Sequence, residues 1–400
     1  MKTQSSPVWV LGVTQVISWG ILYYAFGVMA PAIQAELQLA PAQLYGAFSW
    51  AVLVAGVASV PVGILIDRIG GRRVMAAGSL VSGAGLLVLA WCSGVAGYFA
   101  AWTVMGAGMA MTLYEAAFAT LNRSLREASR KAISNVTLMG GLASTVFWPL
   151  TAWLLGRQDW RQTCLVFAAA LLAVCLPLHL LLDDGAPPAP ALARKDGQQH
   201  YSLRQAVAEP VFWLLASVFA AHAFTFSALS VHMIPLIRRI GHAGHLAVTL
   251  AALIGPMQVA GRLVERALVG RATPQAVGVV TFAGLPAALL VLYALGASAW
   301  AVVLFCLIYG MTNGVLTILR GTLPQAVFGH AHYGAIAGAL AAPSLIAKAG
   351  APLLLAFMLE GGAYQPLLGG LFLLSLASFA LYLFAVRSQE RGLWRSRAPM

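Results

Sequence analysis

Long apolar stretches run through the whole chain, and short clusters of charged and turn-forming residues separate them. A helix needs roughly 20 largely apolar residues to cross a bilayer, so a window of that length locates the candidate spans. Twelve spans are predicted at residues 8–32, 44–66, 74–92, 97–120, 133–156, 163–182, 210–235, 246–267, 276–295, 299–319, 333–358 and 364–386. The pattern therefore predicts an all-α membrane protein.

One segment interrupts the apolar pattern near the middle of the chain. Residues 183–209 are rich in Pro, Ala and charge and show no apolar period, which is typical of a linker between domains. We predict an N-terminal six-helix bundle at 1–182, a cytoplasmic linker at 183–209, a C-terminal six-helix bundle at 210–386 and a cytoplasmic tail at 387–400.

Composition and charge support this interpretation. The chain is 60% hydrophobic and 9% charged, with a mean hydropathy of +0.83, outside the range of soluble domains. A net charge of +12 is also typical of nucleic-acid-binding proteins, but here the basic residues lie in short clusters between spans. Most of the 24 Lys and Arg fall on one side of the predicted topology. The positive-inside rule then places both termini in the cytoplasm. We expect the protein to lie in an inner (plasma) membrane of the bacterial type. We expect no nucleic-acid partner.

The residues that usually carry enzyme or metal chemistry are scattered. The four cysteines form no CxxC pair, so neither a disulfide framework nor a metal site is predicted. The histidine pairs at 242–245 and 330–332 lie in loops on opposite sides of the predicted topology, without nearby carboxylates. We expect no enzyme, cofactor or metal. A non-transporting membrane scaffold or receptor is a distant alternative.

A short motif follows the second predicted span. In "GILIDRIGGRR" the glycine permits close helix packing, the aspartate can cap a neighbouring helix, and the arginines suit the inner headgroup region. Its residues are Gly63, Asp67, Arg68, Arg72 and Arg73. A degenerate copy, "GRLVERALVGR", follows the eighth predicted span with Gly261, Glu265 and Arg266. Such a repeat indicates two pseudo-symmetric halves.

The motif, the twelve spans and the central linker resemble the major facilitator superfamily. The resemblance implies two pseudo-symmetric six-helix bundles, a cavity between them, transport by alternating access, and a gating role for the motif. Two features of the drug antiporter branch are absent: Trp102 stands where that branch has an Arg, and the glycine pattern of its fifth helix is missing.

Two intramembrane cations carry the substrate prediction. Arg262 and Lys348 resemble the Arg and Lys that the monocarboxylate carrier and oxalate/formate antiporter branch uses for carboxylates, although Gln258 replaces the Asp that precedes the Arg in eukaryotic monocarboxylate carriers. A charge inside a span is costly, so an anionic substrate would supply the missing partner. Arg262 can alternatively snorkel, or pair with Glu115 or a helix end.

Further candidates for substrate binding recur at helical spacing, so each set lies on one face of its predicted helix. Gln15, Trp19 and Tyr23 recur every four residues, His222 lies on a stripe with Phe226 and Ser230, and Tyr309 lies one turn before Asn313. Aromatic belts and helix-bridging histidines are the structural alternatives. Glu115 is either the carrier of a coupling proton or a static partner of a cation.

These observations predict a monomeric secondary active transporter that moves a small organic anion across the lipid bilayer. Protons are one candidate coupling ion, and exchange is another. The alternative is an efflux carrier for neutral or cationic metabolites or drugs.

Overall fold

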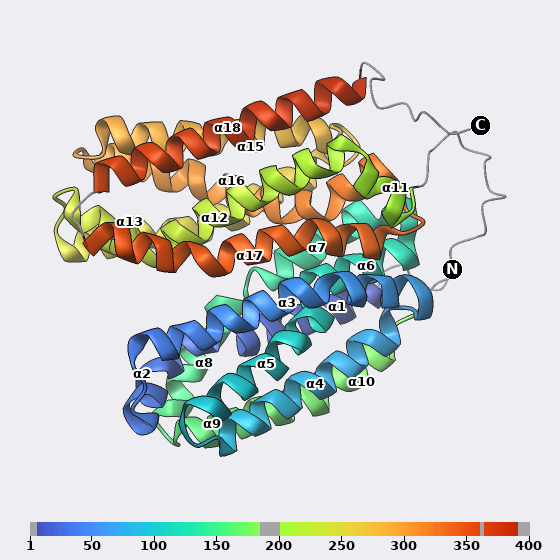
Figure 1. Cartoon of the computed structure of the whole chain (residues 1–400), viewed down its shortest axis with the longest axis vertical. Coiled ribbons are helices and arrows are strands. Elements are labelled where there is room, and N and C mark those ends of the chain that lie inside the picture. Colours follow the sequence, from blue (N-terminus) through green and yellow to red (C-terminus); the bar gives the residue numbers. More distant parts are fainter. Residues whose placement is uncertain (1–5, 185–200, 361–363, 391–400) are drawn as a thin grey trace. The chain divides into compact units, whose positions relative to one another are not determined.

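The computed structural model describes residues 6–184, 201–360 and 364–390, and these residues are almost entirely helical (Figure 1). The chain divides into two compact units. Unit 1 comprises Met1–Tyr201 and Val327–Ala342, and unit 2 comprises Ser202–Ala326 and Pro343–Met400. The division differs from the sequence-based one, because the loop and the first turns of the eleventh span pack with the N-terminal helices.

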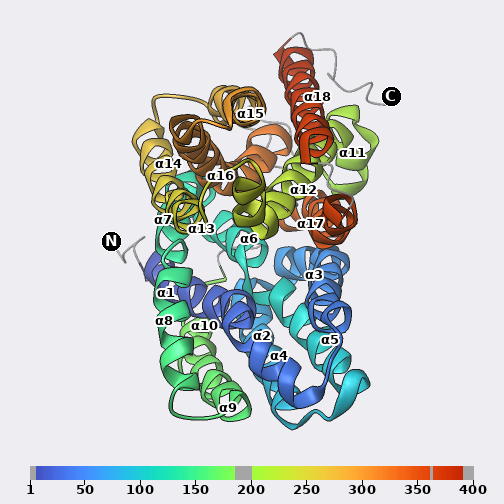
Figure 2. The ribbon, with the colours of Figure 1, turned by 90° about the vertical axis from the view of Figure 1, so that its left-hand side faces the viewer.

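Unit 1 is built on the first six spans, several of which are divided into shorter helices. Its elements are α1 (Ser6–Trp19), η1 (Gly20–Tyr24), α2 (Ala25–Leu37), α3 (Pro41–Ile69), α4 (Gly71–Trp91), α5 (Gly94–Thr112), α6 (Tyr114–Leu125), η2 (Arg126–Ala128), α7 (Ser129–Gly140), α8 (Ala143–Leu155), α9 (Trp160–Ala170), η3 (Leu171–Cys175) and α10 (Leu176–Leu180). Within this unit α1 packs on α7, α8 and α10, and α5 packs between α3 and α4 (Figure 2).

Unit 2 contains the remaining helices, two of which extend into unit 1 at one end. They are α11 (Leu203–Ala208), α12 (Pro210–Arg239), α13 (Gly244–Ala252), α14 (Ile254–Leu268), α15 (Pro274–Leu295), α16 (Ala299–Phe328), α17 (Tyr333–Glu360) and α18 (Tyr364–Glu390). The predicted linker ends in a real helix, since Ser202 and Gln205 form a capping box at the start of α11. The rest of that linker, 185–200, and the tail from 391 lie outside the described residues.

Within the described residues, eleven helices are long and apolar enough to cross a membrane. The predicted eighth span at 246–267 is divided in the structure, because α13 and α14 meet there at Leu253. Neither helix reaches the length of a span alone, whereas together they cover the predicted segment. Gly255 and Pro256, directly after the interruption, give a local reason for it.

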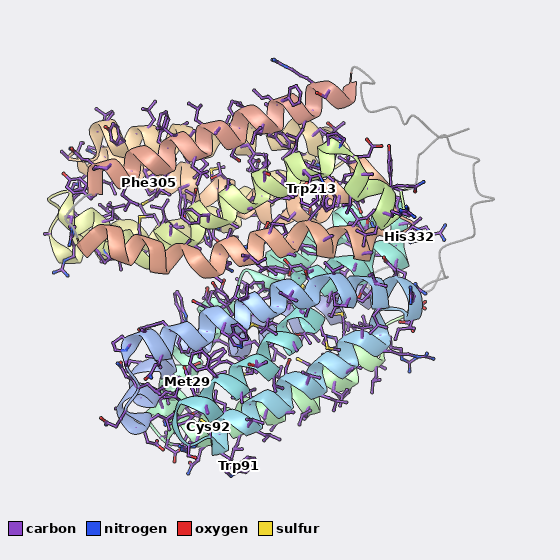
Figure 3. The ribbon with its side chains drawn as sticks, in the orientation of Figure 1. Met29, Trp91, Cys92, Trp213, Phe305 and His332 are labelled. Carbon is purple, nitrogen blue, oxygen red and sulfur yellow. The ribbon has the colours of Figure 1, made fainter. Side chains whose placement is uncertain are left out.

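Small residues bring the helices of each unit close together. In unit 1 a Cβ atom on Gly106 would meet the Ala51 carbonyl oxygen of α3 at 2.5 Å, and one on Gly108 would collide with Ser82 of α4. Figure 3 shows Met29 inside this unit and Trp91 at its edge, in agreement with exposed fractions of 3% and 71%. In unit 2, Phe305 is fully buried in the apolar core.

Asp67 ties the end of α3 to the beginning of α17 inside unit 1. Its Oδ1 accepts the Gly334 N–H at 2.9 Å and its Oδ2 accepts the Ala335 N–H at 2.8 Å. The backbone of Gly63 lies directly against Gly334, where a side chain would not fit. The expectation that Asp67 caps a neighbouring helix is thus confirmed, while Arg68, Arg72 and Arg73 are exposed. The gating role of the motif stays a prediction.

Hydrogen bonds of Arg123 and Arg72 lie next to this cap, and sequence reasoning missed them. Arg123 of α6 donates to the carbonyl oxygens of Ile66, Asp67 and Asp184. The Asp184 carboxylate in turn accepts a hydrogen bond from the backbone N–H of Arg72 at 2.8 Å. Charged groups thus complete the hydrogen bonds at the C-terminal end of α3 and the N-terminal end of α4.

Removing the Asp67 carboxylate should loosen the start of α17. Asp67→Ala deletes two charge-assisted hydrogen bonds to first-turn N–H groups, an effect of about 1–2 kcal/mol on the local opening free energy. Hydrogen–deuterium exchange of peptides covering 330–342 should become about 5- to 30-fold faster. Asp159→Ala removes the N-cap of α9 and should accelerate exchange only there. Unchanged exchange at 330–342 would contradict the capping role.

Candidate functional site

The fourth span of unit 1 is interrupted at Leu113. This residue has an extended backbone (φ −82°, ψ −167°) and separates α5 from α6. In a continuous helix the Thr112 carbonyl would accept from the N–H four residues later. Here it accepts the Gln15 Nε2–H of α1 at 2.7 Å, and Gln15 is fully buried. A side chain from the first span therefore completes a hydrogen bond that the interruption leaves open.

Interruptions in two neighbouring spans lie beside this one. The first span passes through the π-helical turn η1 directly after Trp19, and the fifth span is divided between Gly140 and Ala143. The ring of Tyr114, the first residue of α6, lies 5.0 Å from the Trp19 ring, and its hydroxyl group packs against Gly140. Three irregular helix segments thus meet around Tyr114, and π-helical turns are frequent at functional sites.

Aromatic rings extend this region. Tyr23 lies in η1 with its ring centroid 5.3 Å from that of Trp19 and 5.1 Å from that of Phe48. Trp19 and Tyr23 are half-buried. Glu115 is half-buried in the first turn of α6, next to Tyr114. Gln15, Trp19 and Tyr23 therefore lie along the part of the first span that packs beside the interruption, which is followed by Tyr114 and Glu115. Sequence reasoning missed Tyr114.

Unit 2 contains the two cations that the sequence singled out. Arg262 of α14 is 6% exposed, and its Nε has no hydrogen-bond partner among the described residues. Helix α14 packs tightly on α16, because Gly261 and Gly314 each meet backbone atoms of the other helix. Glu265, three residues after Arg262, is fully buried. The close glycine contacts hold the arginine in the interior of the unit.

Lys348 lies on α17 at a point where this helix contacts α12. The backbone oxygen of Lys348 accepts the Ser227 hydroxyl at 2.8 Å, and the lysine side chain is half-buried. Hydrogen bonding of α12 to α17 fixes the position of the lysine along the span. Arg262 and Lys348 thus belong to the same unit but are held by different helix pairs.

The remaining predicted residues of unit 2 have separate environments. Tyr309 is 1% exposed, donates to the Phe226 carbonyl oxygen at 3.3 Å and stacks on the Phe226 ring. Asn313, one turn later on α16, is 9% exposed. His222 is 2% exposed, neither ring nitrogen has a hydrogen-bond partner among the described residues, and its ring meets Phe282 of α15 edge-on.

The surroundings of His222 show whether this residue bridges two helices, which is the structural alternative to substrate binding. A histidine that bridges two helices would hydrogen-bond through at least one ring nitrogen. His222 makes no such bond among the described residues, so the structure does not give it the bridging role. Its neighbour on the stripe, Phe226, packs instead on α16. The stripe therefore contacts two different helices.

Metal-ligating residues do not gather in the described part of the chain. No group of three or more His, Cys, Asp or Glu side chains is close enough there to hold a metal ion. The four cysteines are buried as free thiols. In unit 1 the candidate residues are aromatic and amide side chains beside interrupted helices, and in unit 2 they include two cations. Side chains of these kinds suit noncovalent binding.

Solved transporter structures have the same fold. A variant of the Escherichia coli fucose:proton symporter FucP superimposes with a TM-score of 0.71 and 14% identity, covering 95% of this chain and 98% of the other. The human organic anion transporter MFSD10 (TETRAN) gives a TM-score of 0.67 with 17% identity over 94% of this chain and 98% of that one.

Sequence comparisons agree with the fold. An uncharacterised 38 kDa protein encoded in a 23S RNA operon of Thermoproteus tenax is 28% identical over 378 residues, which is 93% of this chain and 92% of that protein. The family model of the Major Facilitator Superfamily matches residues 9–352. Together with the helical architecture, this match shows that the chain is a multi-pass membrane transporter, not an enzyme, and that it belongs to the major facilitator superfamily.

Proposed function

We propose that the protein is a secondary active transporter for a small organic anion bearing a carboxylate. The observation that carries this proposal is the burial of Arg262, which is 6% exposed and has an Nε without a hydrogen-bond partner among the described residues. Guanidinium groups are protonated at any physiological pH, so burial does not neutralise this charge. A buried guanidinium that lacks part of its hydrogen bonding favours a site that an anion completes.

The chemistry of the two cations suits a carboxylate. A guanidinium offers a planar fork that can bind both oxygens of one carboxylate, whereas an ammonium group acts as a mobile point charge. Lys348 lies well inside α17, far from the first turn that Asp67 caps. We assign Arg262 the role of fixing the orientation of the anion and Lys348 that of adding charge within unit 2.

Relatives with the same fold support the class of function but not the cargo. The fucose:proton symporter and the human organic anion transporter are both under 20% identical to this chain. One of these proteins transports a sugar and the other organic anions, so the fold accommodates both neutral and anionic cargo. Arg262 and Lys348 of this chain are what favour an anion.

The proposal includes the gate, the membrane topology, the oligomeric state and the coupling residue. The Asp67 cap acts as a cytoplasmic gate that is released during alternating access, and its two hydrogen bonds to α17 are the contacts that must break. The protein resides in an inner membrane of the bacterial type with both termini in the cytoplasm, and it works as a monomer. Glu115 carries a coupling proton, because it lies half-buried at the interruption of the fourth span.

Neutralising either cation should strongly weaken anion transport. Arg262→Gln and Lys348→Gln each remove a charge-assisted contact, which corresponds to about a 10- to 100-fold loss of apparent affinity. The measurement is uptake of radiolabelled mono- and dicarboxylates into proteoliposomes, with and without a pH gradient.

The control for this experiment is Arg239→Gln, which removes an exposed arginine at the end of α12. We expect it to transport like the wild type. Wild-type rates in both Arg262→Gln and Lys348→Gln would overturn the anion proposal. Export of hydrophobic amines, with no response to any carboxylate, would identify the chain as an efflux carrier instead.

Glu115→Gln should separate proton coupling from substrate exchange. The amide keeps the size of the side chain but cannot release a proton, so accumulation driven by a pH gradient should be lost while exchange between equal substrate pools persists. Glu209→Gln, at the start of α12, provides the matched control. Unchanged pH dependence in Glu115→Gln would assign Glu115 a static structural role.

A further inference from the structure

The side-chain amide of Gln15 forms a hydrogen bond through its nitrogen, whereas its oxygen has no partner among the described residues. Its Nε2 donates to the Thr112 carbonyl oxygen at 2.7 Å, immediately before the interruption at Leu113. Its Oε1 has no hydrogen-bond partner among the described residues, although the side chain is fully buried. An unsatisfied buried acceptor is unfavourable, so this oxygen marks a position where a donor is missing.

The orientation of this amide is fixed by its partner. If the amide were flipped, Oε1 would face the Thr112 carbonyl oxygen, and two acceptors would be in contact. The Thr112 hydroxyl cannot relieve this, because it already donates to the Gly108 carbonyl oxygen at 2.8 Å. The unsatisfied atom is therefore the acceptor oxygen, and it lies beside the interruption.

The surroundings restrict what kind of donor fits. Helix α6 has 12 residues and starts directly after Leu113, so the positive end of its dipole and its first-turn N–H groups face the interruption. This end disfavours an ammonium group. A carboxylate could accept from the N–H groups but could not donate to Oε1. A hydroxyl group can donate to Oε1 and accept from a backbone N–H at the same time.

Aromatic rings border the same region. The rings of Trp19 and Tyr114 lie with their centroids 5.0 Å apart and inclined at 43°. Trp19 lies one turn after Gln15 on α1, and Tyr114 is the first residue of α6. Such rings supply an apolar surface for the carbon atoms that carry a hydroxyl group.

We propose that the interruption at Leu113 is a subsite of unit 1 for a hydroxyl group of the transported compound, with Gln15 Oε1 as the acceptor. The substrate class is then a hydroxylated organic anion. The anionic part rests on the proposed function, whereas the hydroxyl subsite stands on unit 1 alone.

Matched ligand pairs test the two parts separately. The purified full-length protein is titrated with malate and succinate, glycolate and acetate, and glycolamide and acetamide, and ligand-induced thermal stabilisation gives the apparent affinities. Within each pair the compounds differ mainly by one hydroxyl group. We expect the hydroxylated member to bind about tenfold more tightly or better, because a site built around a hydroxyl group penalises its absence.

Variants of Gln15 identify the residue responsible. Gln15→Met keeps the length of the side chain but removes the acceptor, and should reduce the preference within each pair to about onefold. Gln15→Asn keeps both the donor nitrogen and the acceptor oxygen on a shorter side chain, and it should retain part of the preference even if Gln15→Met is poorly folded. Ser18→Ala alters another buried polar residue of α1 and should leave the preference unchanged.

The outcomes distinguish the subsite from the anion proposal. Equal binding within the pairs, or a preference that persists in folded Gln15→Met, overturns the subsite and leaves Gln15 a structural role with a bound water. A preference for glycolamide over acetamide, without tighter binding of the carboxylates, supports the subsite and contradicts the anion proposal. No binding of any of the six compounds overturns both.

Discussion

The lack of water inside a membrane is the constraint on which this structure depends. Backbone polar groups that leave a helix there must find partners within the protein. The chain nevertheless interrupts its fourth span at Leu113, and the Thr112 carbonyl freed by this interruption takes its hydrogen bond from Gln15. Within the part of the chain that the structure describes, the Oε1 of the same glutamine has no hydrogen-bond partner. The hydroxyl subsite proposed above rests on this acceptor oxygen.

The same constraint separates the charges of the chain into two groups. Asp67 accepts two backbone N–H groups, and Arg161 pairs with Glu36 at 2.7 Å, so these charges are compensated where they lie. Arg262 is buried more deeply than either partner of that ion pair, and part of its guanidinium has no hydrogen bond among the described residues. This contrast is what supports the proposal that Arg262 binds a ligand.

Some of these features could be predicted from the sequence, because they depend on local patterns. Apolar runs locate the spans, and the order of Gly63, Asp67 and the following arginines predicts the cap on a neighbouring helix. The interruption at Leu113 could not be predicted, since "MTLYEA" contains neither Gly nor Pro. The one at Leu253 had a signal in Gly255 and Pro256. The partners of Arg123 are distant in sequence, and the unsatisfied Oε1 of Gln15 is a property of packing. Neither follows from any local pattern.

We propose that the substrate completes the buried positive charge of unit 2. Rapid addition of an organic carboxylate to proteoliposomes on a solid-supported membrane measures charge displacement directly. We expect a fast displacement of negative charge on binding, which is present in the wild type and in Arg239→Gln and is lost in Arg262→Gln. A signal of the same size in Arg262→Gln, or no signal with any carboxylate in the wild type, would contradict it.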